Sequence, residues 1–106
     1  MFNFAVLGAG RWGSLISWYI SKLGYNLVIW GREGSNHIEN LIKNRCNKFL
    51  CFGPEVQIST DIDLALEQDY LVISINSQNF RSFLSDLKNK NINLKEKKII
   101  LCMKGI

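Results

Sequence analysis

Three glycines near the N-terminus have the spacing of a phosphate-binding turn. Gly8, Gly10 and Gly13 form a GxGxxG motif, GAGRWG, which follows an apolar run at residues 2–7 and precedes a helical pattern of apolar residues. In such a motif the first glycine permits a tight turn, the second lets the backbone approach a diphosphate, and the third lets helix and strand pack closely. The N-terminus of the following helix adds N–H groups and about half a positive charge. A glycine-rich turn without a ligand is the alternative, but strand, motif and helix together favour a dinucleotide-binding site.

The residues at the end of the second apolar run bear on which dinucleotide would bind. Proteins strict for NAD place an Asp or Glu about 20 residues beyond the glycine motif, against the adenosine ribose hydroxyls. Here the run at residues 27–30 is followed by Gly31, Arg32 and Glu33. The guanidinium of Arg32 can pair with a 2′-phosphate or stack on adenine, which favours NADP over NAD, whereas Glu33 argues for NAD. An exposed Arg32 that contacts no ligand is the alternative.

A strand, a helix and a second strand must position these residues. Beyond the glycines, apolar residues recur at the spacing of one helix face, at Trp12, Leu15, Ile16, Tyr19, Ile20 and Leu23. Gly24 stands where a C-terminal helix cap is expected, and residues 27–30 predict the second strand. A strand, helix and strand within about 30 residues predict a βαβ unit, whose strands run parallel through a right-handed crossover.

The middle of the chain continues with shorter elements. Asn36 with Glu39 resembles the capping box of a short helix. Residues 56–59 alternate weakly and predict a third strand, after which Thr60 or Asp61 is expected to cap another short helix.

The last third predicts two more strands around one helix. The apolar runs at residues 70–75 and 99–103 are the strands, and Asn76 and Ser77 are candidate caps of the helix between them. The apolar face of that helix is expected to carry Phe80, Phe83, Leu84 and Leu87. We therefore predict an α/β fold, a Rossmann-type doubly wound parallel sheet with helices on both faces, as a single domain over residues 1–106.

The composition is that of one soluble domain. Of the 106 residues 47% are hydrophobic and 21% are charged, which is typical of a globular chain. The apolar stretches are shorter than the ~20 residues that span a bilayer, and no basic, cleavable leader opens the sequence, so we expect a cytoplasmic protein without membrane partners. Cys46, Cys51 and Cys102 form no CxxC pair and are expected to be reduced thiols. The net charge is +4, with lysines concentrated at residues 88–98, which a solvated loop explains better than nucleic-acid binding.

Other side chains that could do chemistry have simpler interpretations. His37, the only histidine, lies in a polar helix start away from the expected strand ends, so we interpret it as solvated rather than as a general base. Capping and solvation account for the acidic cluster of Asp61, Asp63, Glu67 and Asp69, and we predict no metal site. Trp18 lies beside the apolar face of the first helix, either at the core edge or at an interface with another domain.

The motifs together resemble one family. GAGRWG, then IWGRE, then CMKGI are similar, in this order, to the N-terminal domain of bacterial NAD(P)-dependent glycerol-3-phosphate dehydrogenases. Trp12 is the most specific position, since most GxGxxG proteins lack tryptophan there. NKFLCFG at residues 47–53 resembles the family's Asn-x-x-Tyr-Leu-Pro-Gly loop, and SINSQ at residues 74–78 is similar to its strand ending in Pro-Ser-Gln.

This resemblance implies a reaction and a set of contacts. The reaction is reversible hydride transfer between NAD(P)H and dihydroxyacetone phosphate, giving sn-glycerol 3-phosphate for phospholipid synthesis. Arg11 and Trp12 would line the cofactor diphosphate, Arg32 would contact the adenosine end, and Lys104 would touch both cofactor and substrate. A lysine just beyond a parallel strand also lies where ligands bind, and can attract a phosphate or a carbonyl oxygen. A frayed C-terminal lysine is the alternative reading of Lys104.

The family also has a helical C-terminal domain, which supplies a second lysine and further substrate-binding residues. We expect this chain to end after its fifth strand, before that domain, and to bind nucleotide without catalysing the reaction. We assign no catalytic residue within this chain. The full-length enzyme is a candidate homodimer.

Several positions depart from the family pattern. Arg11 stands where the family usually has serine, Asn76 replaces a proline, and Cys51 with Phe52 alters the Leu-Pro-Gly loop. These departures leave open the nicotinamide-side contacts of Ile75, Asn76 and Asn79.

Two other kinds of protein share part of the pattern. A free-standing NAD(P)-sensing module would need the glycine motif but would have no use for a lysine presented to a substrate. A ketopantoate or hydroxyacid reductase has a related architecture, but Trp12 and the Lys104-Gly105-Ile106 ending argue against it.

Overall fold

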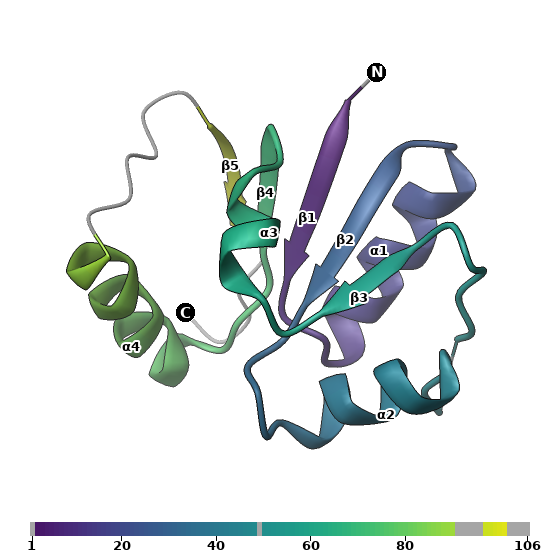
Figure 1. The fold of residues 1–106 in the computed structure, drawn as a ribbon, viewed down its shortest axis with the longest axis horizontal. Helices are drawn as coiled ribbons and strands as arrows, with labels where there is room; N and C mark the ends of the chain where they lie inside the picture. The colour runs from purple at the N-terminus through teal and green to yellow at the C-terminus, as the bar shows by residue number, and fades with distance from the viewer. Residues whose placement is uncertain (1, 49, 91–96, 102–106) are drawn as a thin grey trace.

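The computed structural model describes residues 2–48, 50–90 and 97–101, and forms one parallel sheet with helices on both sides (Figure 1). Strands and helices alternate along the chain in the order β1 (Asn3–Leu7), α1 (Arg11–Lys22), β2 (Asn26–Trp30), α2 (Asn36–Asn44), β3 (Gln57–Ser59), α3 (Ile62–Leu66), β4 (Tyr70–Ile73), α4 (Ser77–Asn89) and β5 (Lys98–Leu101). All neighbouring strands pair in parallel, in the order β3-β2-β1-β4-β5. This arrangement confirms the predicted doubly wound fold. No helix in the described part of the chain has the length and apolar character needed to cross a membrane.

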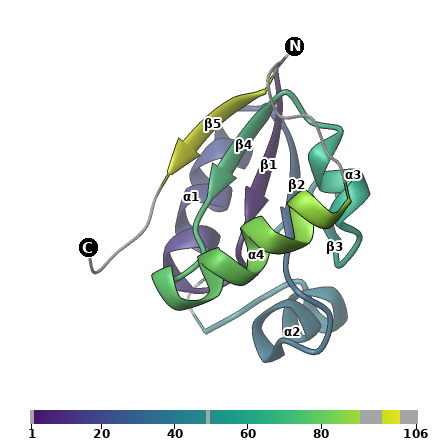
Figure 2. The ribbon, with the colours of Figure 1, turned by 90° about the vertical axis from the view of Figure 1, so that its left-hand side faces the viewer.

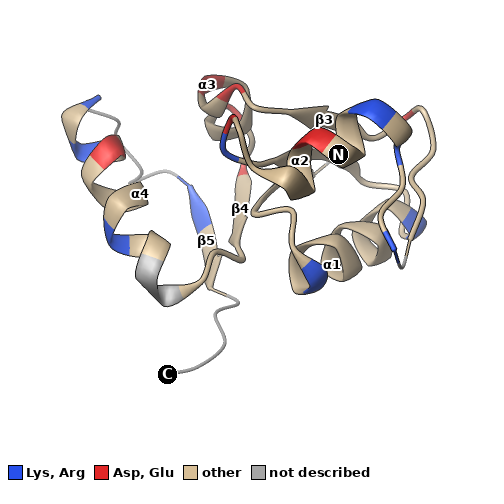
Figure 3. Ribbon diagram, turned by 90° about the horizontal axis from the view of Figure 1, so that it is seen from below, with Lys and Arg blue, Asp and Glu red and all other residues tan. Residues whose placement is uncertain are grey.

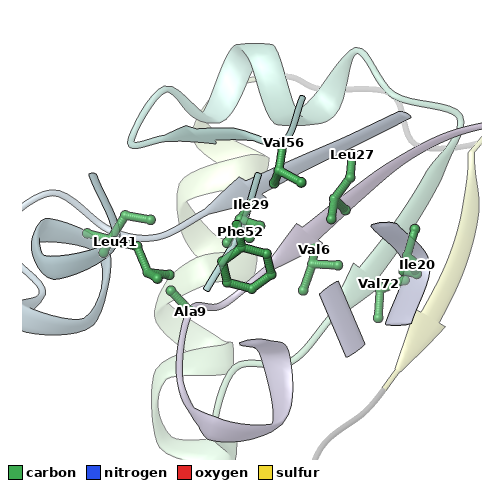
Figure 4. Packing of buried hydrophobic residues seen from close by; sticks show 10 residues of the cluster. Val6, Ala9, Ile20, Leu27, Ile29, Leu41, Phe52, Val56 and Val72 are labelled. Carbon is green, nitrogen blue, oxygen red and sulfur yellow. The ribbon is translucent and has the colours of Figure 1, made fainter. Parts of the chain in front are cut away.

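The pleat of the strands divides the core into two layers. Phe4 and Val6 of β1 face a cluster that includes Ile20 of α1 and Leu41 of α2. Figure 4 shows part of this cluster, in which Val6, Ile29, Phe52 and Val56 lie together. The neighbouring residue Leu7 faces the opposite cluster, with residues of α3 and α4. Successive strand side chains point to opposite faces, so helices cover both faces of the sheet (Figure 2).

Helix α1 packs on the sheet through small residues, which differs from the prediction. Its buried residues are Gly13, Ser14, Ser17 and Ile20. Four residues of the expected apolar face are exposed instead, namely Trp12, Leu15, Tyr19 and Leu23. Small side chains let the helix axis approach β1 closely, and this packing decides the buried face despite the apolar spacing. Trp18 lies at the core edge, packed against the α1–α2 side of the core, with the Lys22 Nζ 5.4 Å from its ring centroid.

The helix ends follow the predicted caps except at α2. Gly24 has a positive φ of 86° directly after the α1 cap, and the side chains of Asp61 and Asn76 cap α3 and α4, as predicted. The cap of α2 is Ser35, so the Asn36 prediction is wrong, since Asn36 is already helical. Along α4, Phe83 and Leu87 are buried but Leu84 is exposed. The buried face of α4 is therefore narrower than the sequence predicted.

The segment after α2 contains a disulfide, contrary to the prediction of reduced thiols. Cys46 and Cys51 are bonded, with their Cα atoms 4.0 Å apart. A tight turn brings them together, because the N–H of Asn47 donates to the Leu50 carbonyl at 2.9 Å and the N–H of Leu50 donates to Oδ1 of Asn47 at 2.8 Å. The cysteines form no CxxC pair, and their spacing in the sequence did not indicate this turn. Cys102 lies outside the described residues.

Arg45 holds this segment against the core. Its φ of 59° ends α2 in the left-handed region, and its half-buried guanidinium donates to the carbonyls of Phe52, Gly53 and Val56. Phe52 and Val56 are themselves buried. One side chain therefore satisfies three backbone acceptors and places two core residues.

Replacing Arg45 is expected to destabilise the fold. Arg45→Ala removes the guanidinium donors to these three carbonyls and leaves that of Gly53 with the Val56 N–H at 3.2 Å, and a hydrogen bond from a charged group contributes about 1.5–3 kcal/mol. Because the guanidinium is only half-buried, its hydrogen bonds contribute less than this range would give for three. We expect the free energy of unfolding to fall by about 2 kcal/mol, measured by urea denaturation. Arg81→Ala, at an exposed position on α4, is the control and should change it by less than about 0.5 kcal/mol. Equal midpoints for the two variants would show that Arg45 does not organise the segment.

Candidate functional site

The turn after β1 can be made only by glycine at its first position. Gly8 has a φ of 126°, and its N–H donates to the Trp30 carbonyl at 2.8 Å. A Cβ on Gly8 would lie 2.8 Å from the carbonyl carbon of Ser74 and closer still to its oxygen. Gly8 therefore lets the chain turn sharply where β1, β2 and β4 end together.

The other two motif glycines have opposite surroundings. A Cβ on Gly13 would lie 2.9 Å from the Gly8 carbonyl carbon, so α1 and the turn are in direct backbone contact. A Cβ on Gly10 would meet no protein atom within 4 Å. The packing tasks predicted for Gly8 and Gly13 are confirmed, and Gly10 lies beside open space.

Helix α1 begins at this open space. Its N-cap is Gly10, whose extended backbone brings no side-chain cap, and no acidic residue lies in the first turn. A helix N-terminus carries N–H groups without intrahelical acceptors and a partial positive charge, which suits an anion.

A cleft of about 390 Å³ runs along the carboxyl ends of β1, β2 and β4. It brings together six of the predicted site residues, Gly8, Gly10, Arg11, Trp12, Gly13 and Arg32. The seventh, Lys104, lies outside the described residues. Ile75, Asn76 and Asn79 also line the cleft, as do Trp30, Gly31, Ser35, His37, Ser74 and Phe83, which the sequence did not single out as site residues.

His37 lies at this cleft, so its predicted position away from the strand ends is wrong. Its side chain is exposed, as expected, but α2 starts close to the end of β2. Gly31 makes this possible, because a Cβ there would lie 2.6 Å from Cβ of Ile38. A glycine directly after the second strand was the available signal that helix and strand end meet here.

Arg32 has a partner that sequence reasoning did not identify. Its Nη2 lies 3.3 Å from Oδ2 of Asp86 on α4, and the two side chains are 53% and 63% exposed. Both residues line a second hollow of about 360 Å³, which shares Trp30, Arg32 and Phe83 with the main cleft. The adenosine end of the predicted site therefore carries a carboxylate beside the guanidinium.

The described ranges contain no group of side chains that could bind a metal ion. Within residues 2–48, 50–90 and 97–101, no three His, Cys, Asp or Glu residues are grouped so as to hold an ion. The shape of the site, a glycine turn, a helix N-terminus and a cationic end, instead suits an elongated anionic ligand.

Comparisons with known proteins agree on one family. Residues 3–106 match the family model described as "NAD-dependent glycerol-3-phosphate dehydrogenase N-terminus". Glycerol-3-phosphate dehydrogenase [NAD(P)+] of Carboxydothermus hydrogenoformans is 39% identical over 78% of this chain and 26% of its own length. The enzyme of the same name from Blochmanniella pennsylvanica is 32% identical over 98% of this chain and 31% of its own. The chain thus spans less than a third of the length of these relatives.

A solved structure shows the same fold. The crystal structure of glycerol-3-phosphate dehydrogenase from Coxiella burnetii superposes with a TM-score of 0.81, at 24% identity, over 99% of this chain and 33% of that one. At this identity the likeness supports the architecture alone.

Proposed function

Because this chain belongs to the NAD-dependent glycerol-3-phosphate dehydrogenase family and matches its N-terminal part, we propose that it forms the cofactor half of an active site for that reaction. The protein as a whole would transfer hydride between NAD(P)H and dihydroxyacetone phosphate. The family assignment confirms the resemblance inferred from the glycine motif, Trp12 and the CMKGI ending. The open space beside Gly10 is the observation that carries the proposal, since it lies at the helix N-terminus where a diphosphate would bind.

The described residues fit a dinucleotide along the cleft. We propose that Gly10 and the first turn of α1 bind the diphosphate, that Arg11 and Trp12 flank it, and that Arg32 binds the adenosine end. When bound, the nicotinamide ring supplies or accepts the hydride. Ile75, Asn76 and Asn79 line the same cleft and are candidates for its nicotinamide side.

Further parts of the proposal concern the substrate and the cofactor preference. Lys104 is proposed to bind the substrate phosphate or its carbonyl oxygen, through its position three residues beyond β5. Arg32 favours NADP(H) over NAD(H), because a guanidinium pairs well with a 2′-phosphate. A cytoplasmic location, a role in phospholipid synthesis and a homodimer of the longer protein belong to the same proposal.

Gly10→Ala tests the diphosphate site. The added methyl meets no protein atom within 4 Å, and Gly10 has an ordinary φ of −75°, so the fold should keep its stability to within about 0.5 kcal/mol. The same methyl would stand where the diphosphate approaches the backbone, and we expect NADPH affinity to fall about tenfold, or about 1.4 kcal/mol. Quenching of tryptophan fluorescence measures binding, since Trp12 and Trp30 line the cleft.

The matched control is Gly53→Ala. It adds a methyl away from the cleft, where the carboxylate of the exposed Glu55 side chain must move aside, and should leave NADPH affinity unchanged. Saturable NADPH binding by the parent protein, together with dihydroxyacetone phosphate reduction by the protein as its gene encodes it, supports the proposal. Absence of any NADPH binding would contradict it.

A further inference from the structure

The ion pair between Arg32 and Asp86 joins two segments that are 54 residues apart in the sequence. Arg32 lies just beyond β2, and Asp86 lies in the second half of α4, which crosses in front of the sheet in Figure 2. α4 carries basic residues and one acidic residue, Asp86 (Figure 3). The acidic one points its carboxylate to the guanidinium, at 3.3 Å.

The Asp86 carboxylate lies near the end of β2, where an acidic side chain influences the choice between NAD and NADP. Dinucleotide-binding proteins strict for NAD have an acidic side chain near the end of the second strand, where it accepts hydrogen bonds from the ribose 2′-hydroxyl and repels a 2′-phosphate. Here β2 ends in Trp30 and is followed by Gly31 and Arg32, and the nearest acidic residue along the chain is Glu33, which lines the second hollow together with Asp86. Asp86 reaches the same neighbourhood from α4, and lines the hollow that shares Trp30 and Arg32 with the cleft.

We propose that Asp86 is a specificity-determining residue that opposes Arg32 and shifts the choice of cofactor from NADP(H) towards NAD(H). It acts in two ways: its carboxylate competes with a 2′-phosphate for the guanidinium, and it accepts a hydrogen bond from a 2′-hydroxyl. The proposal rests on the function proposed above, because it presumes that a dinucleotide binds with its adenosine end at Arg32.

The size of the effect follows from charge and exposure. A phosphate monoester carries about 1.5 to 2 negative charges at neutral pH. Its repulsion by a carboxylate about 6 Å away in water corresponds to about a two- to threefold change in affinity at physiological salt, and to about a four- to sevenfold change at low ionic strength. Exposed ion pairs contribute little to stability, so neutralising Asp86 should leave the fold intact.

The test is the ratio of NADPH to NADH affinity in the protein and its variants. Asp86→Asn is expected to raise this ratio about two- to threefold at physiological salt and about four- to sevenfold at low ionic strength. Asp86→Glu should keep the ratio close to that of the parent protein under both conditions, because it retains the charge. Thermal unfolding of each variant checks that the fold is unchanged.

Asp63→Asn is the matched control. Asp63 forms the other ion pair found in the described residues, with its Oδ1 3.8 Å from the Lys90 Nζ and side chains 71% and 48% exposed. The substitution removes the same charge from an exposed pair, and Asp63 itself lines neither the cleft nor the second hollow. The NADPH to NADH ratio should therefore stay at the parent value.

The outcomes separate this inference from the function on which it rests. If the parent protein binds neither NADPH nor NADH, both the proposed function and the inference are overturned. If it binds both, and Asp86→Asn moves the ratio no more than Asp63→Asn does, only the role of Asp86 is overturned. A shift that does not depend on salt would also overturn it, since a charge effect must be screened.

Discussion

Gly13→Ala is expected to destabilise the protein more than Gly10→Ala does, although both glycines have a φ that alanine can adopt. The new Cβ would lie 2.9 Å from the Gly8 carbonyl carbon and closer to its oxygen, and both belong to backbone that cannot rotate away. Overpacking of this kind costs about 3 kcal/mol, whereas replacing glycine by alanine within a helix gains about 1 kcal/mol. The overlap therefore outweighs the gain in helix propensity, and α1 must move away from β1.

Thermal unfolding measures this prediction. A net loss of about 2 kcal/mol should lower the Tm of a chain of this size by about 10 °C. Gly10→Ala is the control, because it adds the same methyl at the helix start into space with no protein atom within 4 Å. If the two variants unfold at the same temperature, the close contact between α1 and the turn does not contribute to stability as inferred.

Lys104→Ala is expected to have the largest effect on activity. The carboxyl ends of parallel strands face the ligand crevice, and Lys104 follows β5 by three residues. A cation that stabilises developing charge on the substrate oxygen contributes about 100-fold or more to kcat. We therefore expect kcat/KM for dihydroxyacetone phosphate to fall about 100-fold in the protein as its gene encodes it.

Lys98→Ala provides the matched control for this activity measurement. Lys98 begins β5, at the end of the strand opposite to the ligand crevice, and it is exposed. Its removal should leave kcat/KM within about twofold of the parent value. An equal loss in both variants would indicate a general effect of basic charge rather than a substrate contact by Lys104.

The βαβ unit could be predicted because its signals are local. An apolar run of strand length, three glycines at fixed spacing and a second apolar run determine β1, α1 and β2 almost without reference to the rest of the chain. The same holds for the caps at Asp61 and Asn76, which bond to N–H groups two and three residues ahead. The family resemblance also rests on such local motifs.

Apolar spacing predicted the buried face of α1 only in part, at Ile16 and Ile20. Trp12, Leu15, Tyr19 and Leu23 repeat as a core-facing stripe would, yet all four are exposed. The sheet instead packs on Gly13, Ser14 and Ser17. Periodicity records which side chains are apolar, but the distance between helix and strand decides which face fits against the sheet.

By itself, the sequence determined the alternation of strands and helices, the glycine turn that must open α1, and the cation placed just beyond β2. Each of these depends on residues that are neighbours along the chain, or on a conformation that only glycine adopts easily. Only the tertiary structure decided that His37 lines the cleft, that Cys46 bonds to Cys51, and that Asp86 meets Arg32. The positions of His37 and Asp86 depend on how α2 and α4 lie against the sheet, and no local pattern encodes the distance between segments as far apart in the chain as β2 and α4. The disulfide depends on a local turn closed by Asn47 and Leu50, which the spacing of the cysteines does not indicate.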